Sequence, residues 1–328
     1  MKLTSATVAH EASATGFEPE PLEKVLRLLG LLDGLHRHPF LKPRFALKGG
    51  TALNLFWFDV PRLSVDIDIN YIGAVDRETM INERPTVERA IQAICSREDL
   101  TVARMPGDHA GGKWRLTYAA ASGGSGHVEL DINFLLRTPL WPCVESECRA
   151  VGSFSGAPTT VLDVHELAAG KLAALLARSA SRDIFDSRAL LSIPTLDVTK
   201  LRLAFVVYGG MNRRDWRTVS TGDVKVDVNE VQTALVPMLR STVAPTRGVV
   251  RAWTARLVEE CRARLSMILP LNDDELEFLR RLNDEGEVAP ALLTADARMQ
   301  AIIRQHPGLR WKAQNVRQHF GLRPGSRE

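Results

Sequence analysis

The segment from residue 64 to 71, SVDIDINY, alternates between polar and apolar residues. This period of two is typical of a β-strand with one buried face and one exposed face. The β-branched residues would face the core, and the polar residues Ser64, Asp66, Asp68 and Asn70 would share the opposite face. The segment therefore predicts a strand that presents two carboxylates on one side.

This spacing of carboxylates indicates a cation site. Asp66 and Asp68 would have Cβ atoms roughly 6–7 Å apart, given a rise of about 3.3 Å per residue. Like charges this close repel each other unless a cation lies between them or one carboxyl is protonated. Asp131, in VELDINF, has the same parity in a second predicted strand over 128–136. If the two strands are neighbours, three carboxylates could bind two metal ions, the arrangement used for in-line attack on phosphorus.

A Gly-Gly-Thr turn precedes the acidic strand. Gly49 and Gly50 have no side chains, so their N–H groups could approach a phosphate closely. Thr51 could add a hydroxyl donor near the start of a short helix. Alone, an Asp-x-Asp pair is more often a solvated strand face, and a Gly-Gly pair is more often an ordinary turn. Together they favour a site for a nucleoside triphosphate and its metal ions.

The composition indicates an ordinary globular protein. The 328 residues are 45% hydrophobic and 25% charged, and this length favours two domains of about 100–200 residues each. The net charge of +3 implies no nucleic-acid partner by itself, although residues 171–217 hold nine Lys/Arg and four Asp/Glu. The four cysteines form no C-x-x-C pair, which indicates reduced thiols. With no signal peptide and no long apolar stretch, we expect a cytoplasmic protein without a membrane span.

The order of the predicted elements gives an α+β fold. We expect a flexible N-terminal arm over 1–18 and an α/β domain with a mixed sheet over 19–155. A mainly helical domain over 156–328 would follow, completing the active site and binding the acceptor. Residues 107–113 partly match a P-loop, but Trp114 stands where Ser or Thr would bind Mg²⁺, so a hairpin loop is favoured.

A helix is predicted over residues 164–180 and onward. On one continuous helix, Lys171, Arg178 and Arg182 would fall within about 20–40° of one another. They would form a cationic face that suits a triphosphate or an RNA end. The alternative is a solvated basic face on a surface helix.

These motifs resemble the nucleotidyltransferase signature of the polymerase-β-like superfamily, in the form found in AbiEii/AbiGii-type toxins, including MenT-type toxins. The first motif is GGTAL…SVDID, and the second is the helix HELAAGKLAALLARSASRDIFDSRAL. The second motif carries Lys171, Arg178, Arg182, Asp183 and Asp186. The resemblance extends from about Phe45 to His319, with HPGLRWKAQNVRQH as weaker support. Many relatives have Gly-Ser where this chain has Gly50-Thr51, which keeps the hydroxyl.

The resemblance implies roles for the matched residues. Asp66 and Asp68 would bind Mg²⁺ or Mn²⁺, with Asp131 as a third ligand or base. The catalytic set would be Asp66, Asp68, Asp131, Lys171 and Asp183. The nucleotide-binding set would be Gly49, Gly50, Thr51, Ser64, Lys171, Arg178 and Arg182. As a hypothesis, phosphorylation of Ser64 would place negative charge beside Asp66, repel the triphosphate and silence the enzyme.

The activity implied by the resemblance is transfer of NMP from an NTP to RNA, with the 3′ end of tRNA as the expected acceptor. This would block aminoacylation and translation, as expected of a toxin whose antitoxin is encoded by an adjacent gene, without necessarily forming a stable complex with it. Two alternatives stay open. One is a nucleotidyltransferase acting on a small molecule or a protein side chain, and the other is a non-catalytic module that binds nucleotide or RNA.

Overall fold

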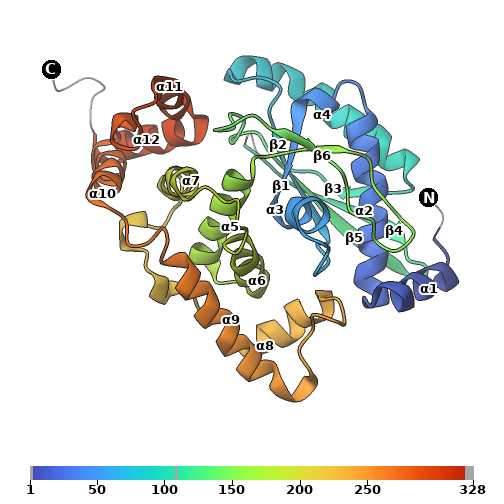
Figure 1. The fold of residues 1–328 in the computed structure, drawn as a ribbon. Helices are drawn as coiled ribbons and strands as arrows, with labels where there is room; N and C mark the ends of the chain where they lie inside the picture. The colour runs from blue at the N-terminus through green and yellow to red at the C-terminus, as the bar shows by residue number, and fades with distance from the viewer. Residues whose placement is uncertain (1–2, 108–109, 322–328) are drawn as a thin grey trace. The chain divides into compact units, whose positions relative to one another are not determined.

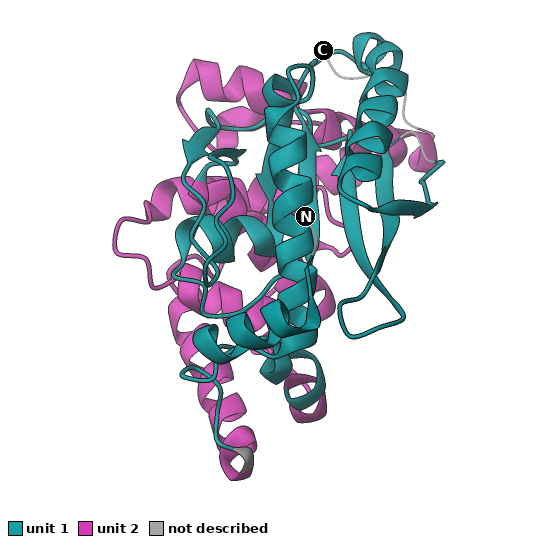
Figure 2. Cartoon of the chain, turned by 90° about the vertical axis from the view of Figure 1, so that its right-hand side faces the viewer, with its two compact units in different colours: residues 1–163, 232–247 teal, residues 164–231, 248–328 magenta. Residues whose placement is uncertain are grey.

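The computed structural model describes residues 3–107 and 110–321. The chain divides into two compact units (Figure 2). Unit 1 comprises residues 1–163 and 232–247, and unit 2 comprises 164–231 and 248–328. The boundary between the units lies at 163–164, eight residues beyond the predicted boundary at 155. Residues 232–247 belong again to unit 1.

Unit 1 is built on a mixed sheet (Figure 1). Within the described residues the strand order is β3-β4-β5-β2-β1-β7-β6. The strands are β1 (Phe45–Lys48), β2 (Asp66–Tyr71), β3 (Thr101–Arg104), β4 (Gly111–Ala119), β5 (Ser125–Asn133), β6 (Val144–Ser146) and β7 (Thr159–Val161). The β2–β5 and β1–β7 pairs are parallel and the other pairs are antiparallel. The predicted mixed sheet is confirmed.

Helix α2 (Pro19–Arg37) covers the apolar face of the sheet. The guanidinium of Arg27 lies 5.2 Å from the ring centroid of Tyr118 in β4. By strand register, Tyr118 shares its face with the buried Ile67 and Leu130. The carboxylates of β2 and β5 alternate with these residues and therefore lie on the opposite face from α2.

The other helices of unit 1 are α1 (Ser5–Thr15), α3 (Gly49–Ala52) and α4 (Arg77–Arg97). Helix α1 stands where the sequence predicted a flexible arm. The Thr4 side chain caps it by accepting from the N–H of Thr7, and the buried Glu11 accepts hydrogen bonds from Ser153. The N-cap and the long-range contact to Ser153 therefore stabilise this helix. Its weak hydrophobic periodicity gave little sign of a helix in the sequence.

Residues 232–247 join unit 1 through main-chain hydrogen bonds. The N–H of Leu63 donates to the carbonyl of Met238 at 2.7 Å, and the N–H of Arg240 donates to the carbonyl of Pro61 at 3.0 Å. This segment therefore holds the chain that leads into the acidic strand β2.

Unit 2 is helical in its described part, which confirms the predicted mainly helical region. Its helices are α5 (Val164–Arg178), α6 (Ser181–Leu190), α7 (Val198–Gly210), α8 (Val228–Glu230), α9 (Val250–Leu265), α10 (Asp273–Arg280), α11 (Ala297–Gln305) and α12 (Pro307–Phe320), with short 3₁₀ and π-helical turns between them. Helix α5 packs against α6 and α7, and Leu172, Phe205 and Trp216 are fully buried. Among the described residues, none of the helices combines the length and apolar character needed to cross a bilayer.

Candidate active site

The strand register brings two aspartates together. Asp68 in β2 is the direct neighbour of Asp131 in the parallel strand β5, and Asp66 is paired with Glu129. Directly paired residues point to the same face of a sheet, so Asp66, Asp68 and Asp131 share one surface. The predicted pairing of the two acidic strands is confirmed.

Two lysines extend this pair into a row across four strands. Lys48 in β1 is paired with Asp68, and Lys113 in β4 is paired with Asp131. We call Lys48, Asp68, Asp131 and Lys113 the charged row. Sequence reasoning missed both lysines, although Lys48 directly precedes the Gly-Gly turn. Adjacent like charges destabilise a sheet, and the flanking cations partly offset this repulsion.

Burial and charge shift the pKa values in the charged row. Burial and the neighbouring charge of Asp68 raise the pKa of Asp131, against the opposing effect of both lysines. Burial lowers the pKa of Lys48, against the attraction of Asp68 and Asp131. The Lys113 ammonium donates to Glu129 at 2.6 Å, and this bond raises its pKa. An additional cation at the carboxylate pair would relieve the repulsion that remains.

Gly49 places the turn directly against Asp68. Its φ is +71°, in the left-handed region that favours glycine. A Cβ atom added to Gly49 would lie 2.2 Å from Oδ2 of Asp68. The main chain of the Gly-Gly turn is therefore packed against the carboxylate of Asp68.

Replacing Gly49 by alanine is expected to abolish most nucleotide transfer, because the new methyl group must displace the Asp68 carboxylate. The left-handed backbone should add a stability cost of about 1–2 kcal/mol. Gly123→Ala is the matched control: Gly123 also has a positive φ, of +96°, but an added Cβ meets nothing within 4 Å. In urea unfolding both variants should show the cost of the positive φ, and Gly49→Ala should lose more stability because only its methyl group meets another atom. Equal activity of the two variants would contradict the role of this close approach.

The other turn residues are buried. The Thr51 hydroxyl, expected as a phosphate donor, instead donates to the main-chain carbonyl of Asp66 and so fixes the turn to the strand. A Cβ on Gly50 would lie 2.7 Å from Oγ of Ser64 and 2.9 Å from a guanidinium nitrogen of Arg62. Ser64 is 8% exposed and precedes β2, which begins at Asp66 and not at residue 64. Arg62 is 2% exposed, and sequence reasoning missed this buried cation.

The helical motif forms an ion cluster in unit 2. The Lys171 ammonium is 3.0 Å from Oδ1 of Asp183 and 3.0 Å from Oδ2 of Asp186. Nε of Arg178 donates to Oδ2 of Asp183 at 2.7 Å. Burial would raise the pKa of Asp183, but Lys171 and Arg178 outweigh it and hold that pKa below its usual value. Asp186, which matched the family pattern but was outside the predicted site, is fully buried in this cluster.

The continuous helix expected through residues 171–182 is wrong. Helix α5 ends at Arg178, Ser179 has a φ of +55°, and α6 begins at Ser181. The chain reverses there, so α6 carries Asp183 back to the side chains of α5. Arg182 lies half-buried on α6, and the three cations do not form one helical face.

The carboxylates of β2 and β5 suit a hard cation without forming a closed cage. Among residues 3–107 and 110–321, no group of three or more His, Cys, Asp or Glu side chains is arranged to hold a metal ion. Mg²⁺ commonly takes only one or two protein carboxylates, with water and substrate phosphates as its other ligands. The Asp68–Asp131 pair, with the raised pKa of Asp131, fits a metal that arrives with a nucleotide.

The match to a family model defines this protein as a nucleotidyltransferase. The sequence model described as "Nucleotidyl transferase AbiEii toxin, Type IV TA system" matches residues 31–315. The chain therefore belongs to the AbiEii family and is a nucleotidyltransferase toxin of a toxin–antitoxin system.

A solved structure has a similar fold. It is that of MenT4, a nucleotidyltransferase toxin from Mycobacterium tuberculosis H37Rv, with 19% sequence identity and a TM-score of 0.61. The match covers 94% of this chain and 99% of MenT4. A comparison with curated protein sequences found no match.

Proposed function

We propose that this toxin transfers a nucleoside monophosphate from an NTP to an RNA acceptor, the 3′ end of tRNA. The observation that carries the proposal is the direct pairing of Asp68 with Asp131 beside the Gly49 turn. Such a modification would block aminoacylation and translation. Action on tRNA would place the protein in the cytoplasm, with an antitoxin from the adjacent gene limiting its effect.

The acidic face would hold the metal. Asp66 and Asp68 would bind Mg²⁺ or Mn²⁺, with Asp131 as a third ligand or as general base. Bound there, the metal would supply positive charge against the charge that develops on the transferring phosphoryl group. The metal would arrive with the NTP, because the described residues do not supply a complete set of ligands and the phosphates would complete it.

The chain's own groups would position the reactants. The N–H groups of Gly49 and Gly50 would bind the triphosphate. The acceptor hydroxyl oxygen forms a bond to the α-phosphorus, the bond to the β-phosphate oxygen breaks, and pyrophosphate leaves. The hydroxyl proton would pass to a base, and Asp131, which lies beside Asp68 on the acidic face, is the carboxylate that we propose for this role.

The unit 2 cluster would also be required. Lys171 and Asp183 match the family motif, and their ion pair is buried. In the present cluster Lys171 is neutralised by two aspartates, so we propose that contact with a phosphate would require it to exchange one of these partners. Arg178, whose side chain is 66% exposed, is the more accessible cation of the cluster.

Labelled NTPs identify the class of acceptor. The full chain is incubated with each α-labelled NTP and Mg²⁺, in separate reactions with total RNA, proteins and small metabolites. We expect label in the tRNA band and its loss with EDTA. Label confined to a protein or a small molecule would support the corresponding alternative acceptor. Absence of any label would support a non-catalytic binding module.

A further inference from the structure

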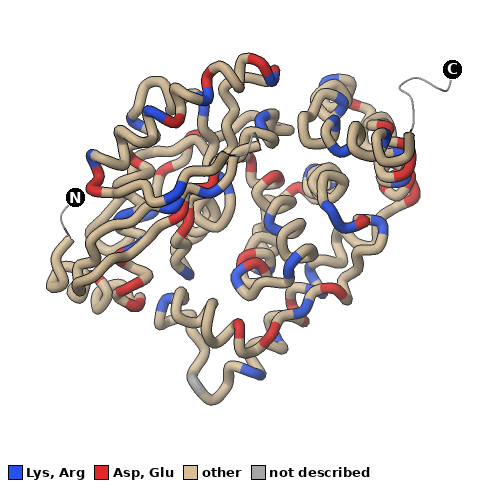
Figure 3. Tube along the Cα trace, turned by 180° about the vertical axis from the view of Figure 1, so that it is seen from behind, with Lys and Arg blue, Asp and Glu red and all other residues tan. Residues whose placement is uncertain are grey.

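The C-terminal helices of unit 2 carry one sign of charge. Residues 297–320, which span α11 and α12, contain five Lys or Arg and no Asp or Glu (Figure 3). By contrast, the arginines on the preceding segment are paired with carboxylates. Arg280 lies 2.7 Å from Glu277, and Arg281 lies 2.8 Å from the same residue.

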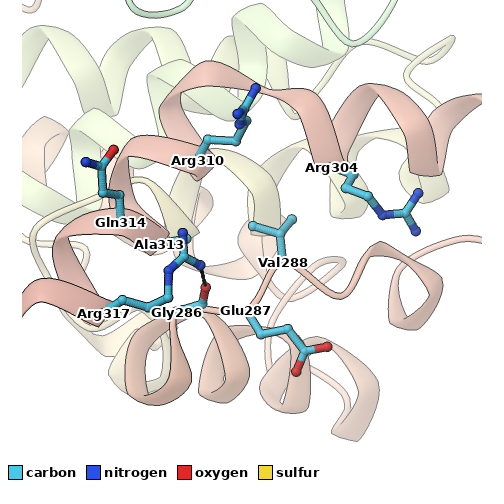
Figure 4. A pocket seen from close by; sticks show the side chains of 8 residues that line it. All are labelled: Gly286, Glu287, Val288, Arg304, Arg310, Ala313, Gln314 and Arg317. Carbon is cyan, nitrogen blue, oxygen red and sulfur yellow. Dashed lines mark hydrogen bonds between the residues drawn. The ribbon is translucent and has the colours of Figure 1, made fainter. Parts of the chain in front are cut away.

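Three of these basic residues line a cavity of about 310 Å³ (Figure 4). Its lining consists of Gly286, Glu287, Val288, Arg304, Arg310, Ala313, Gln314 and Arg317. This volume is at the lower end of the range of about 300–1,000 Å³ for ligand pockets. We call this the arginine pocket.

The arginine pocket has an excess of uncompensated positive charge. Across the described residues, neither Arg304 nor Arg310 has an ion pair with a carboxylate. The single carboxylate of the lining, Glu287, lies 3.6 Å from Arg281, outside the lining. Arg317 donates to the carbonyl of Gly286, which fixes its guanidinium at the wall of the pocket (Figure 4).

The chemistry of the pocket suits an anionic ligand with oxygen acceptors, such as a phosphate group. Guanidinium groups match the geometry of phosphate oxygens and bind them through paired N–H donors. Trp311, the next residue after Arg310 on α12, is 50% exposed. Trp311 is not part of the lining, but an RNA strand held in the pocket could place an unpaired base on this neighbouring indole of α12. An acidic protein has no base to stack there.

We propose that the arginine pocket binds backbone phosphates of an RNA, with Trp311 stacking on a base. The inference rests on the proposed function, because it assigns this surface to the acceptor RNA. Unlike the proposed function, this inference concerns RNA binding alone, so it can be tested without measuring nucleotide transfer.

The test measures binding of labelled total tRNA to the full-length protein over a range of salt concentrations. Arg304→Gln/Arg310→Gln should lower affinity about tenfold or more at low salt. It should also reduce the slope of log affinity against log salt by about 1.4–1.8, the effect of two lost phosphate contacts. Trp311→Ala should lower affinity about fivefold or more with little change in that slope. Binding of NTP should be unchanged in both variants.

The matched control is Arg251→Gln/Arg256→Gln, which removes the same charge from exposed positions on α9. Equal losses in this control and the pocket variant would overturn the assignment, as would wild-type tRNA affinity in the pocket variant. Binding of inorganic phosphate or an acidic polypeptide without binding of tRNA would also overturn it. Pocket-dependent tRNA binding without nucleotide transfer would uphold this inference and reject the proposed activity.

Discussion

Asp68→Asn is expected to reduce nucleotide transfer by at least about 10²–10³-fold while the protein stays folded. The amide keeps the shape of the side chain but loses the charge that we propose binds the metal. Asp68 lies between Lys48 and Asp131 in the charged row. Loss of its charge therefore removes one attraction, to Lys48, and one repulsion, from Asp131. The free energy of unfolding should therefore change by only about 1 kcal/mol.

The measurement is the initial rate of label transfer from NTP, with urea unfolding of the same preparations. Asp59→Asn is the matched control, because Asp59 is an exposed carboxylate of unit 1 outside the charged row. This control should keep wild-type activity. If Asp68→Asn retained more than a tenth of the wild-type rate, the acidic pair could not be the catalytic centre.

Lys171→Met is expected to lower the free energy of unfolding by about 3–5 kcal/mol, the cost of breaking a buried ion pair. Its ammonium lies 3.0 Å from both Asp183 and Asp186, and Asp186 is fully buried. Methionine fills a similar volume but leaves these carboxylates with less compensation. Loss of activity is also expected and would follow from either the structural or the catalytic role of Lys171.

A second substitution separates these two roles. Lys171→Met/Asp186→Asn removes one carboxylate with the amine and should recover part of the lost stability without recovering activity. Lys225→Met, at an exposed lysine of the same unit, should change stability by no more than about 0.5 kcal/mol. Wild-type stability of Lys171→Met in urea unfolding would show that the buried cluster does not stabilise the fold.

The acidic strands could be predicted because a strand has a strict period of two. One buried face fixes the parity of Asp66, Asp68 and Asp131, and a shift of one residue would bury all of them. The additional inference was that the two strands are neighbours, and the register confirms it. The helical motif likewise predicted α5 from its apolar periodicity.

Long-range and local backbone features were beyond the sequence pattern. Lys48 enters the charged row only through the register of β1 with β2, which no local signal specifies. The break at Ser179 requires a positive φ at a residue other than glycine, which is uncommon. The return of residues 232–247 to unit 1 depends on main-chain hydrogen bonds made by residues far apart in the sequence.

The most direct test uses tRNA whose terminal ribose diol has been destroyed by periodate, beside untreated tRNA from the same preparation. The wild-type chain is given both with Mg²⁺ and an α-labelled NTP that the acceptor assay has shown to be used. We predict label at the end of untreated tRNA and none in oxidised tRNA. Equal labelling of both would contradict transfer to the 3′ end, and absence of label from untreated tRNA would contradict tRNA as the acceptor.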